Sequence, residues 1–404
     1  MYLVGGAVRD RVLGIDPHDE DYCVTGIELS DFIDMFGDAR VRGIDFPVFI
    51  IEGCEVALAR SEEKVSQGYK GFKINTSKDI TIEQDLKRRD ITINAMAQDV
   101  LTGEFIDPYG GKEDIEKGII KHVSSAFAED PLRCYRVARF AAKYNYSVYE
   151  ETKKLMTSLK KELKTIPEDR VFMEVRKALL TDSPSKFFEV LKDTDLLDVH
   201  FKEIQDLIGQ TQPEKYHPEG DAFNHTMIVL DKVSKETGDP SIRFAALVHD
   251  LGKGVTPKEM LPHHYGHEEA GVKIIEKMGK RLRFPADWIN KGKNAAKYHM
   301  IAARFDNMRP YKQAVFFNLI NHTSLGLKNL EIIVNADEML NRGRVEFAEL
   351  AERVMTQVSG KSLFEEGITP KSVGGEQFGH ILLERQARLI KEIEDKNINE
   401  NSRE

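Results

Sequence analysis

The sequence predicts an α+β fold in which strands come first and the rest of the chain is helical. Short apolar runs bounded by turn residues fill the N-terminal part, a pattern typical of strands. Residues 149–200 instead carry apolar side chains at helical spacing. The chain has 404 residues, which is enough for two or three domains. A polar stretch rich in helix breakers at residues 213–220 predicts a domain boundary.

The composition is that of a folded protein without a membrane segment. The chain is 41% hydrophobic and 31% charged. Residues 1–4 lack a basic signal-peptide region, and no apolar run is long enough to span a bilayer. Three widely spaced cysteines, Cys23, Cys54 and Cys134, indicate free thiols. We therefore expect a cytoplasmic protein. The net charge of -9 argues against indiscriminate coating of nucleic acid but is compatible with a local basic groove.

A glycine pair and two aspartates near the N-terminus predict a phosphate and metal site. Gly5 and Gly6 stand between an apolar run and a helical stretch, where backbone N–H groups can approach phosphate oxygens. If residues 20–24 form a strand, Asp19 and Asp21 point to the same face. Two carboxylates so placed can hold Mg²⁺. The alternative is a glycine-rich turn followed by solvated acids, which the combination of both features disfavours.

Two further strands are predicted at residues 45–51 and 55–60, with a hairpin turn at residues 52–53. On the second strand, Glu55 could face the two aspartates as a third carboxylate, although a solvated strand acid is equally consistent with the pattern. Residues 61–80 are polar and contain glycines, so we expect a mobile loop there.

A basic run followed by Asp90 and Asn94 is the second motif. These two residues are four apart, so on a helix they would be neighbours that could both face a ribose hydroxyl. Arg89 adds positive charge suited to a triphosphate, although residues 87–89 alone are typical of a solvated basic turn. Residues 107–111 are predicted to form a structural turn.

Three arginines at intervals of three make up the third motif. Asp130 is followed by Arg133, Arg136 and Arg139 among apolar residues, which is unusual for a core helix. Asp130 and Arg139 would lie on opposite sides of an ideal helix. We therefore expect two stations, Asp130 with Arg133 and Arg136 with Arg139. In the alternative interpretation Asp130 is a helix N-cap, with Pro131 at the first helical position.

Potential metal ligands recur in the C-terminal half. His225 begins an apolar-periodic helix, His249 and Asp250 end another, and Asp337 lies in a later helical segment. Imidazole and carboxylate groups together suit a divalent transition metal or Mg²⁺. A lone histidine is more often packed in a core than bound to a metal. The prediction of a metal site therefore rests on the four residues together.

Several segments carry weaker expectations. The loop at residues 263–267 contributes further candidate contacts to the metal or the substrate, namely His263, His264 and His267. Residues 165–168 match a capping box that opens a helix. The lysine-rich residues 153–164 could follow an RNA backbone or form a solvated face. Residues 395–404 are expected to be frayed.

Together these motifs resemble the class II nucleotidyltransferases, which are the CCA-adding tRNA enzymes and the bacterial poly(A) polymerases. The stretch GGAVRD followed by DED matches their opening, RRDITINA matches their R-R-D-x-x-x-N-A stretch, and EDPLR matches their E-D-x-x-R template. The histidines and aspartates of the C-terminal half resemble the metal set of HD-domain phosphohydrolases. The resemblance covers nearly the whole chain and is closest to CCA-adding enzymes with a C-terminal HD domain.

This resemblance implies an activity and a domain order. The activity is addition of C, C and A to the 3′ end of tRNA from CTP and ATP, with the tRNA hydroxyl attacking the α-phosphorus. An HD domain implies a second, phosphodiesterase or phosphatase activity, for example on 2′,3′-cyclic phosphates. The implied order is a nucleotidyltransferase head with a small mixed sheet, a helical tRNA-binding region, an HD domain and a helical tail, at residues 1–140, 141–215, 216–350 and 351–404.

The resemblance also assigns site residues. Asp19 and Asp21 would be catalytic and hold Mg²⁺, with Glu55 at the place of a family acid. The nucleotide-binding residues would be Gly6, Arg9, Arg89, Asp130, Arg133, Arg136 and Arg139. The HD metal would be Ni²⁺, Mn²⁺, Co²⁺ or Mg²⁺, and its ligands would be His225, His249, Asp250 and Asp337.

Three other functions compete with CCA addition. A bacterial poly(A) polymerase shares the head but usually carries long basic extensions, which this acidic chain lacks. An RNA-binding module with a dead polymerase site is disfavoured by the intact aspartates. A phosphohydrolase whose head only recruits RNA is the third alternative. The intact segment at residues 61–80 favours addition of the whole CCA sequence, because partial enzymes tend to lack a comparable loop.

Overall fold

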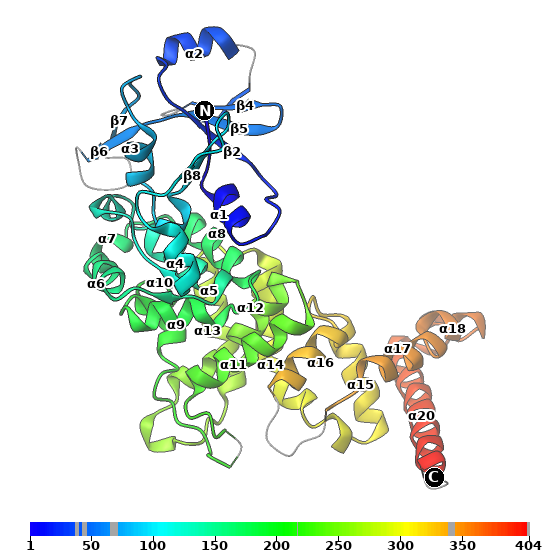
Figure 1. Ribbon diagram of the computed structural model, residues 1–404. Helices are drawn as coiled ribbons and strands as arrows, with labels where there is room; N and C mark the ends of the chain where they lie inside the picture. The colour runs from blue at the N-terminus through cyan, green and yellow to red at the C-terminus, as the bar shows by residue number, and fades with distance from the viewer. Residues whose placement is uncertain (37–39, 43–46, 65–71, 216, 338–343, 402–404) are drawn as a thin grey trace. The chain divides into compact units, whose positions relative to one another are not determined.

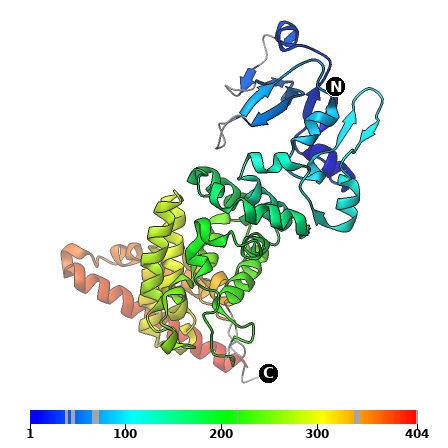
Figure 2. The same ribbon diagram turned by 90° about the vertical axis from the view of Figure 1, so that its left-hand side faces the viewer.

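The fold is α+β, as predicted, with strands at the N-terminus and helices after them (Figures 1 and 2). The computed structural model describes residues 1–36, 40–42, 47–64, 72–215, 217–337 and 344–401. They form two compact units, Met1–His200 and Phe201–Glu404. Among the described residues, every helix is too short or too polar to cross a lipid bilayer.

A seven-stranded mixed sheet is the centre of the N-terminal part, with strand order β3-β4-β5-β2-β1-β8-β9. Strands β2 and β5 are parallel, and the other neighbouring pairs are antiparallel. The strands are β1 (Tyr2–Val4), β2 (Asp21–Val24), β3 (Arg40–Arg42), β4 (Val48–Ile51), β5 (Cys54–Leu58), β8 (Ala97–Asp99) and β9 (Phe105–Ile106). The predicted hairpin is confirmed, because β4 and β5 pair around Glu52 and Gly53, whose φ angles are 50° and 88°.

Apolar side chains cover both faces of this sheet. Cys23 of β2 belongs to a buried cluster with Leu86 of α3 (Ile82–Lys87). Its neighbours Tyr22 and Val24 pack instead against the cluster of Phe32, from α2 (Leu29–Phe36). Successive strand residues point to opposite faces, so this alternation places α3 and α2 on opposite sides of the sheet.

The segment predicted as a mobile loop at residues 61–80 contains two strands. Strands β6 (Ser61–Lys64) and β7 (Phe72–Asn75) form an antiparallel hairpin, so the loop prediction is wrong for these strands. Residues 65–71 lie outside the described residues. Strands β10 (Ile119–Ile120) and β11 (Ser147–Val148) form a further parallel pair.

Helices make up the rest of the first unit. They are α1 (Gly6–Val12), α4 (Gly111–Lys117), α5 (Arg133–Tyr144), α6 (Glu150–Ser158), α7 (Lys160–Leu163), α8 (Glu168–Leu179) and α9 (Ser185–Asp193), with 3₁₀ turns η1 (Thr92–Asn94) and η2 (Ser125–Glu129). The predicted helical character of residues 149–200 is confirmed. The predicted capping box is wrong, because α8 follows Pro167 without a side-chain cap, and Thr165 Oγ1 donates instead to the Glu162 carbonyl.

Helices also build the second unit. Helix α10 (Leu197–Gln205) is kinked at Phe201, where the unit begins. The others are α11 (Ala222–Glu236), α12 (Pro240–Val248), α13 (His267–Arg281), α14 (Ala286–Ala302), α15 (Pro310–Asn321), α16 (Leu327–Ala336), α17 (Ala348–Gln357), α18 (Gly360–Glu365), α19 (Pro370–Val373) and α20 (Gly375–Asn401), with 3₁₀ turns η3 (Leu251–Val255), η4 (Lys258–Met260) and η5 (Phe305–Asn307). The predicted fraying of the tail is wrong as far as Asn401, because α20 continues to that residue. Residues 402–404 lie outside the described part of the chain.

Candidate functional site

The turn after β1 has two reasons to be glycine. Gly5 has a φ of 67°, a region that residues with a Cβ rarely adopt. A Cβ at this position would also lie 2.7 Å from Arg89 Nη1. The glycine turn that was predicted to bind phosphate is therefore also the place where the Arg89 guanidinium packs against the Gly5 backbone.

Three carboxylates gather at the start of β2. Asp21 is in register with Glu55 on the parallel neighbour β5, and Asp19 precedes the strand. Partial burial raises the pKa of Asp21, as do the negative charges of Glu55 and Asp19, while Arg89 opposes the shift. Repulsion among carboxylates is what a bound divalent cation relieves. The residues present therefore fit a Mg²⁺ site, with Glu55 beside the predicted pair.

A buried aspartate organises the basic run of the second motif. The Asp85 carboxylate accepts from Arg88 Nη2 at 2.6 Å and from Arg89 Nη2 at 3.2 Å. Burial would raise the pKa of Asp85, but the two guanidinium charges lower it on balance. Arg88 and Arg89 are half-buried, so this run is not a solvated turn.

A chain of hydrogen bonds joins the first motif to the third. Arg9 donates to Asp10 Oδ1 at 2.9 Å and to Asn94 Oδ1 at 2.5 Å. Asn94 donates to Asp90 Oδ1 at 3.1 Å, and Arg136 Nε donates to Asp90 Oδ2 at 2.7 Å. Burial opposes ionisation of Asp90, but Arg136 and Asn94 lower its pKa to about 2. This network fixes the relative positions of α1, the second motif and α5.

One detail of this network differs from the predictions, and a second adds to them. Asp90 and Asn94 are in contact, but through a turn into η1 rather than along an α-helix. Arg9 is buried, and its guanidinium lies 5.5 Å from the ring centroid of Phe140 and 5.4 Å from that of Tyr144. Arg9 therefore packs against two aromatic side chains of α5, and it also lines the cavity described below.

The alternative interpretation, with Asp130 as the helix N-cap and Pro131 at the first helical position, is wrong. Leu132 is the N-cap of α5, so Asp130 and Pro131 precede the helix. Asp130 Oδ1 accepts from the Leu132 N–H at 3.0 Å, and Arg133 Nη1 donates to the Ala126 carbonyl at 2.7 Å.

The later arginines of this motif pair with different carboxylates. Arg136 binds Asp90, whereas Arg139 Nε donates to Glu174 Oε2 of α8 at 2.6 Å. Arg136 and Arg139, which were expected to form one station, therefore have different carboxylate partners, although both line the same cavity.

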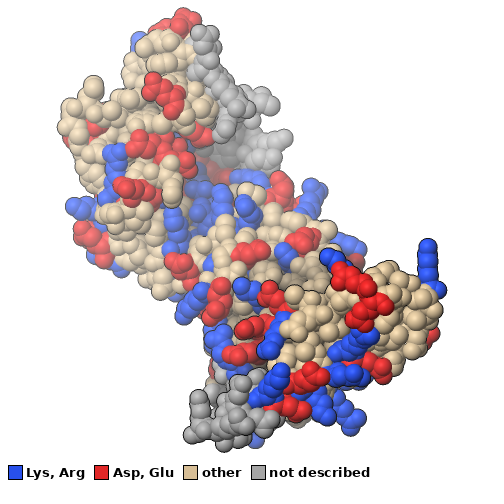
Figure 3. Space-filling model, turned by 90° about the vertical axis from the view of Figure 1, so that its right-hand side faces the viewer, with Lys and Arg blue, Asp and Glu red and all other residues tan. Residues whose placement is uncertain are grey.

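One cavity of about 550 Å³ brings the three motifs together, a size within the range of small-ligand pockets. It is lined by Gly5, Gly6, Arg9, Asp21, Arg88, Arg89, Asp90, Asn94, Asp130, Leu132, Arg133, Arg136, Arg139, Phe140 and Arg170. Asp19 and Glu55 are outside this lining. The sequence interpretation missed Arg170, because one arginine in an amphipathic helix carries no motif. Lys and Arg side chains also gather in a recess of the face in Figure 3, despite the net charge of -9.

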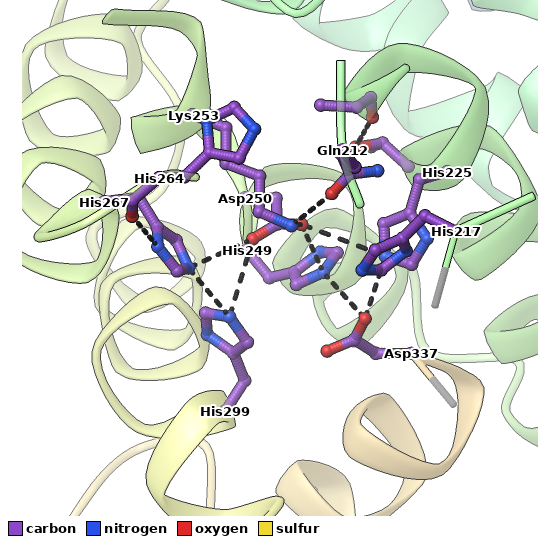
Figure 4. Close-up of polar contacts among 12 residues, drawn as sticks. Gln212, His217, His225, His249, Asp250, Lys253, His264, His267, His299 and Asp337 are labelled. Carbon is purple, nitrogen blue, oxygen red and sulfur yellow. Dashed lines mark hydrogen bonds and ion pairs between the residues drawn. The ribbon is translucent and has the colours of Figure 1, made fainter. Parts of the chain in front are cut away.

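The four predicted ligands of the C-terminal half converge in the second unit (Figure 4). His225 Nε2 lies 2.8 Å from Asp337 Oδ1 and 3.8 Å from Asp250 Oδ2. His249 Nε2 lies 3.4 Å from Asp250 Oδ2 and 3.9 Å from Asp337 Oδ1. These side chains come from α11, the end of α12 and the end of α16.

Two observations test whether a metal fits there. His249 Nε2 is buried without a hydrogen-bond partner among the described residues, although two carboxylates are near. Burial disfavours the charged form of His225, but hydrogen bonds to Asp337 and Glu219 raise its pKa to about 9. A cation between the imidazoles and the carboxylates would give His249 Nε2 a partner. It would also take the place of the proton that the carboxylates favour on His225. The residues present therefore fit a metal.

Two more histidines extend this cluster beyond Asp250. His267 Nε2 and His299 Nε2 each lie 3.5 Å from Asp250 Oδ1, so they could provide a second position for a metal. His267 was expected in a loop but begins α13. His299 was missed, because a single histidine within α14 resembles a core residue. Among the described residues, His263 and His264 do not lie close enough to other potential ligands to share a metal with them.

Two neighbouring groups hold this cluster in place. Lys253 Nζ lies 2.5 Å from Asp250 Oδ2 and donates to Gln212 Oε1 at 2.7 Å. Glu219 Oε1 lies 2.7 Å from His225 Nδ1. A carboxylate on the distal nitrogen orients a ligating imidazole and leaves its other nitrogen for the metal.

Comparison with known proteins matches three family models along the chain. Residues 1–121 match the poly A polymerase head domain, residues 145–208 match a probable RNA and SrmB-binding site of polymerase A, and residues 222–326 match the HD domain. Together with the cavity, these matches define a nucleotidyltransferase that carries an HD domain.

A relative of nearly equal length identifies the family. The multifunctional CCA protein of Thioalkalivibrio sulfidiphilus (strain HL-EbGR7) is 40% identical over 396 residues, which is 92% of this chain and 94% of the relative. The chain therefore belongs to the multifunctional CCA protein family. A poly(A) polymerase is not favoured.

Solved structures agree on the fold. A Thermotoga maritima CCA-adding enzyme complexed with tRNA has a TM-score of 0.63 and 20% identity, covering 96% of this chain and 86% of that chain. A CCA-adding enzyme in complex with ATP has a TM-score of 0.62 and 21% identity, covering 95% and 85%.

Proposed function

We propose that this protein adds C, C and A to the 3′ end of tRNA from CTP and ATP without a nucleic-acid template. The observation that carries the proposal is the single cavity in which Asp21 and Arg89 of the first two motifs meet Asp130 and Arg133 of the third. The full-length similarity to a multifunctional CCA protein supports the same activity. The expected partners are tRNA, CTP and ATP, and the expected location is the cytoplasm.

In the proposed reaction, the tRNA 3′-hydroxyl gives up its proton to water, and its oxygen forms a bond to the α-phosphorus. The bond between that phosphorus and the β-phosphate oxygen breaks, and pyrophosphate leaves. Asp19, Asp21 and Glu55 would hold Mg²⁺, which supplies charge neutralisation at the transferring phosphoryl group. Arg89 and Arg88 provide positive charge for the triphosphate, and Asp85 fixes both of them. Positioning and electrostatic stabilisation supply most of the catalysis in such transfers.

Base choice would fall to Asp130 and Arg133. A carboxylate accepts from the exocyclic amine of C or A, and a guanidinium donates to an acceptor on the base edge. Both residues line the cavity, and both are held by bonds to the backbone. U and G present a carbonyl oxygen in place of that amine, so the same carboxylate would repel them.

The test is incubation of the purified protein with tRNA that lacks its 3′ end, with each nucleotide separately and in pairs. We expect CTP alone to add C residues and CTP with ATP to complete the end. Long adenylate tails from ATP alone would instead favour poly(A) polymerase. Absence of any incorporation would favour an RNA-binding module with a dead site.

We propose a second function for the HD domain, hydrolysis of phosphate esters such as the 2′,3′-cyclic phosphates of RNA ends. The buried His249 Nε2 faces Asp250 and Asp337 and has no hydrogen-bond partner among the residues that the structure describes, which supports this function. A bound divalent metal lowers the pKa of its water and polarises a phosphoryl oxygen. Hydrolysis assays with Ni²⁺, Mn²⁺, Co²⁺ and Mg²⁺ test it, and inactivity with all four would contradict it.

A further inference from the structure

Helix α8 holds both ends of the third motif through two residues on one face. Arg170 Nη2 donates to Asp130 Oδ2 at 2.9 Å, and Glu174 Oε2 accepts from Arg139 Nε at 2.6 Å. Residues four apart are neighbours on a helix surface. The same face of α8 therefore presents a cation to the base-reading carboxylate and an anion to an arginine further along α5.

Asp130 is bound at each of its oxygens. Oδ1 accepts from the Leu132 N–H at 3.0 Å, and Oδ2 accepts from Arg170. Each carboxylate oxygen has two lone pairs, so both can accept another donor from a ligand. The terminal torsion of an aspartate is broad, so the backbone bond alone would leave the carboxylate free to turn. Arg170 restricts that rotation.

The position of Arg170 suits a role at the ligand rather than in the core. The Arg170 and Asp130 side chains are 29% and 28% exposed, and both line the cavity. Arg133 is held separately through the Ala126 carbonyl. Loss of Arg170 would therefore release Asp130 while leaving this bond of the other base-reading residue in place.

We propose that Arg170 is a positioning residue that determines base specificity. It orients the Asp130 carboxylate to accept from the exocyclic amine of C or A, and so to reject the carbonyl of U or G. This inference rests on the proposed function, in which Asp130 and Arg133 read the base.

The experiment compares kcat/KM for CTP against UTP on tRNA lacking its 3′ end, and for ATP against GTP on tRNA ending in CC. Arg170→Ala should lower each ratio about tenfold, within the range of discrimination that base contacts provide. Arg170→Lys keeps a charge and a donor and should restore part of the selectivity. Arg176→Ala removes the same charge from an exposed position of α8 and should leave both ratios unchanged.

The outcomes separate this inference from the proposed function. Unchanged selectivity in Asp130→Ala would mean that the base-reading assignment itself is wrong. Relaxed selectivity in Asp130→Ala with normal selectivity in Arg170→Ala would overturn the role of Arg170 alone. An equal loss for all four nucleotides would show a merely structural role and also overturn it. If Arg170→Ala unfolds, Arg170→Met, which keeps the apolar stem, replaces it in the same comparison.

Discussion

At Gly5, the backbone and a neighbouring side chain impose two separate requirements. A positive φ costs a residue with a Cβ about 1–3 kcal/mol. The close approach of Arg89 adds a second cost, because a Cβ would displace the guanidinium. Gly14 has a similar φ of 71°, but no atom of the described residues lies within 4 Å of the place that a Cβ would occupy, so Gly14 carries only the first cost.

Gly5→Ala should therefore raise the KM for CTP and ATP on the order of tenfold or more, since hydrogen bonds to charged groups contribute about 1.5–3 kcal/mol. Gly14→Ala should reduce stability without changing KM. The measurement is steady-state incorporation combined with thermal unfolding. Equal KM values for the two variants would mean that Arg89 does not bind the nucleotide.

Asp90→Asn should lower the free energy of unfolding by about 2 kcal/mol at pH 7, because each pKa unit corresponds to about 1.4 kcal/mol. Asp90 has a pKa of about 2 in the folded protein against 3.8 for an ordinary aspartate. Its contribution is therefore present above pH 4 and is lost as the pH falls towards 2. Denaturant unfolding at several pH values should show the two proteins converging below pH 4.

The exposed Asp169, which lies on α8, provides the matched control. Asp169→Asn should have little effect at any pH. A constant difference between wild type and Asp90→Asn down to pH 2.5 would contradict the assigned ionisation.

Single residues show where sequence interpretation stops. The types and spacing of Asp21, Arg89 and Asp130 predict a nucleotide site, and all three line one cavity. Their partners could not be predicted, because Asp85 and Arg170 are common residues that gain meaning only through contacts across the fold. A motif identifies the groups that could touch a ligand, but the groups that orient them follow from packing.

Elements were predictable where the local pattern decides the structure. The β4–β5 hairpin followed from two apolar runs on either side of a Glu-Gly turn. The capping at the start of α8 could not be predicted, because the Thr165 hydroxyl donates to a carbonyl in the preceding turn instead of capping the helix. His267 and His299 meet at Asp250 only because α13 packs against α14.

The contact between η3 and α13 depends on Gly252. A Cβ there would lie 1.8 Å from the His267 carbonyl oxygen. Gly252→Ala should therefore move His267 away from Asp250 and destabilise the unit by about 1–3 kcal/mol, as overpacking does. We expect weaker metal binding and slower hydrolysis, measured by calorimetry and by phosphodiester assay.

Gly238 serves as the control, because no atom of the described chain lies within 4 Å of the place that its Cβ would occupy. Gly238→Ala should retain metal binding and hydrolysis. Normal metal affinity in Gly252→Ala would mean that His267 and its contact with η3 are not needed at the site.

At the scale of the whole molecule, the two candidate sites belong to different compact units. The residues around His249 and Asp250 share no member with the nucleotide cavity. We therefore expect the double variant His249→Ala with Asp250→Ala to lose metal-dependent hydrolysis while adding CMP and AMP at nearly the normal rate. Parallel loss of both activities would show that the two sites are not separable.

The most direct test of the central claim concerns the carboxylates at the start of β2. Asp21→Ala, or Asp19→Ala, removes a proposed Mg²⁺ ligand and leaves every arginine of the cavity in the sequence. Incorporation of CMP and AMP should fall by several orders of magnitude, because metal-assisted charge neutralisation contributes several kcal/mol to such transfers. Binding of tRNA, measured in the same preparation by fluorescence anisotropy, should stay nearly unchanged. Near-normal incorporation by either variant at saturating Mg²⁺ would contradict the account.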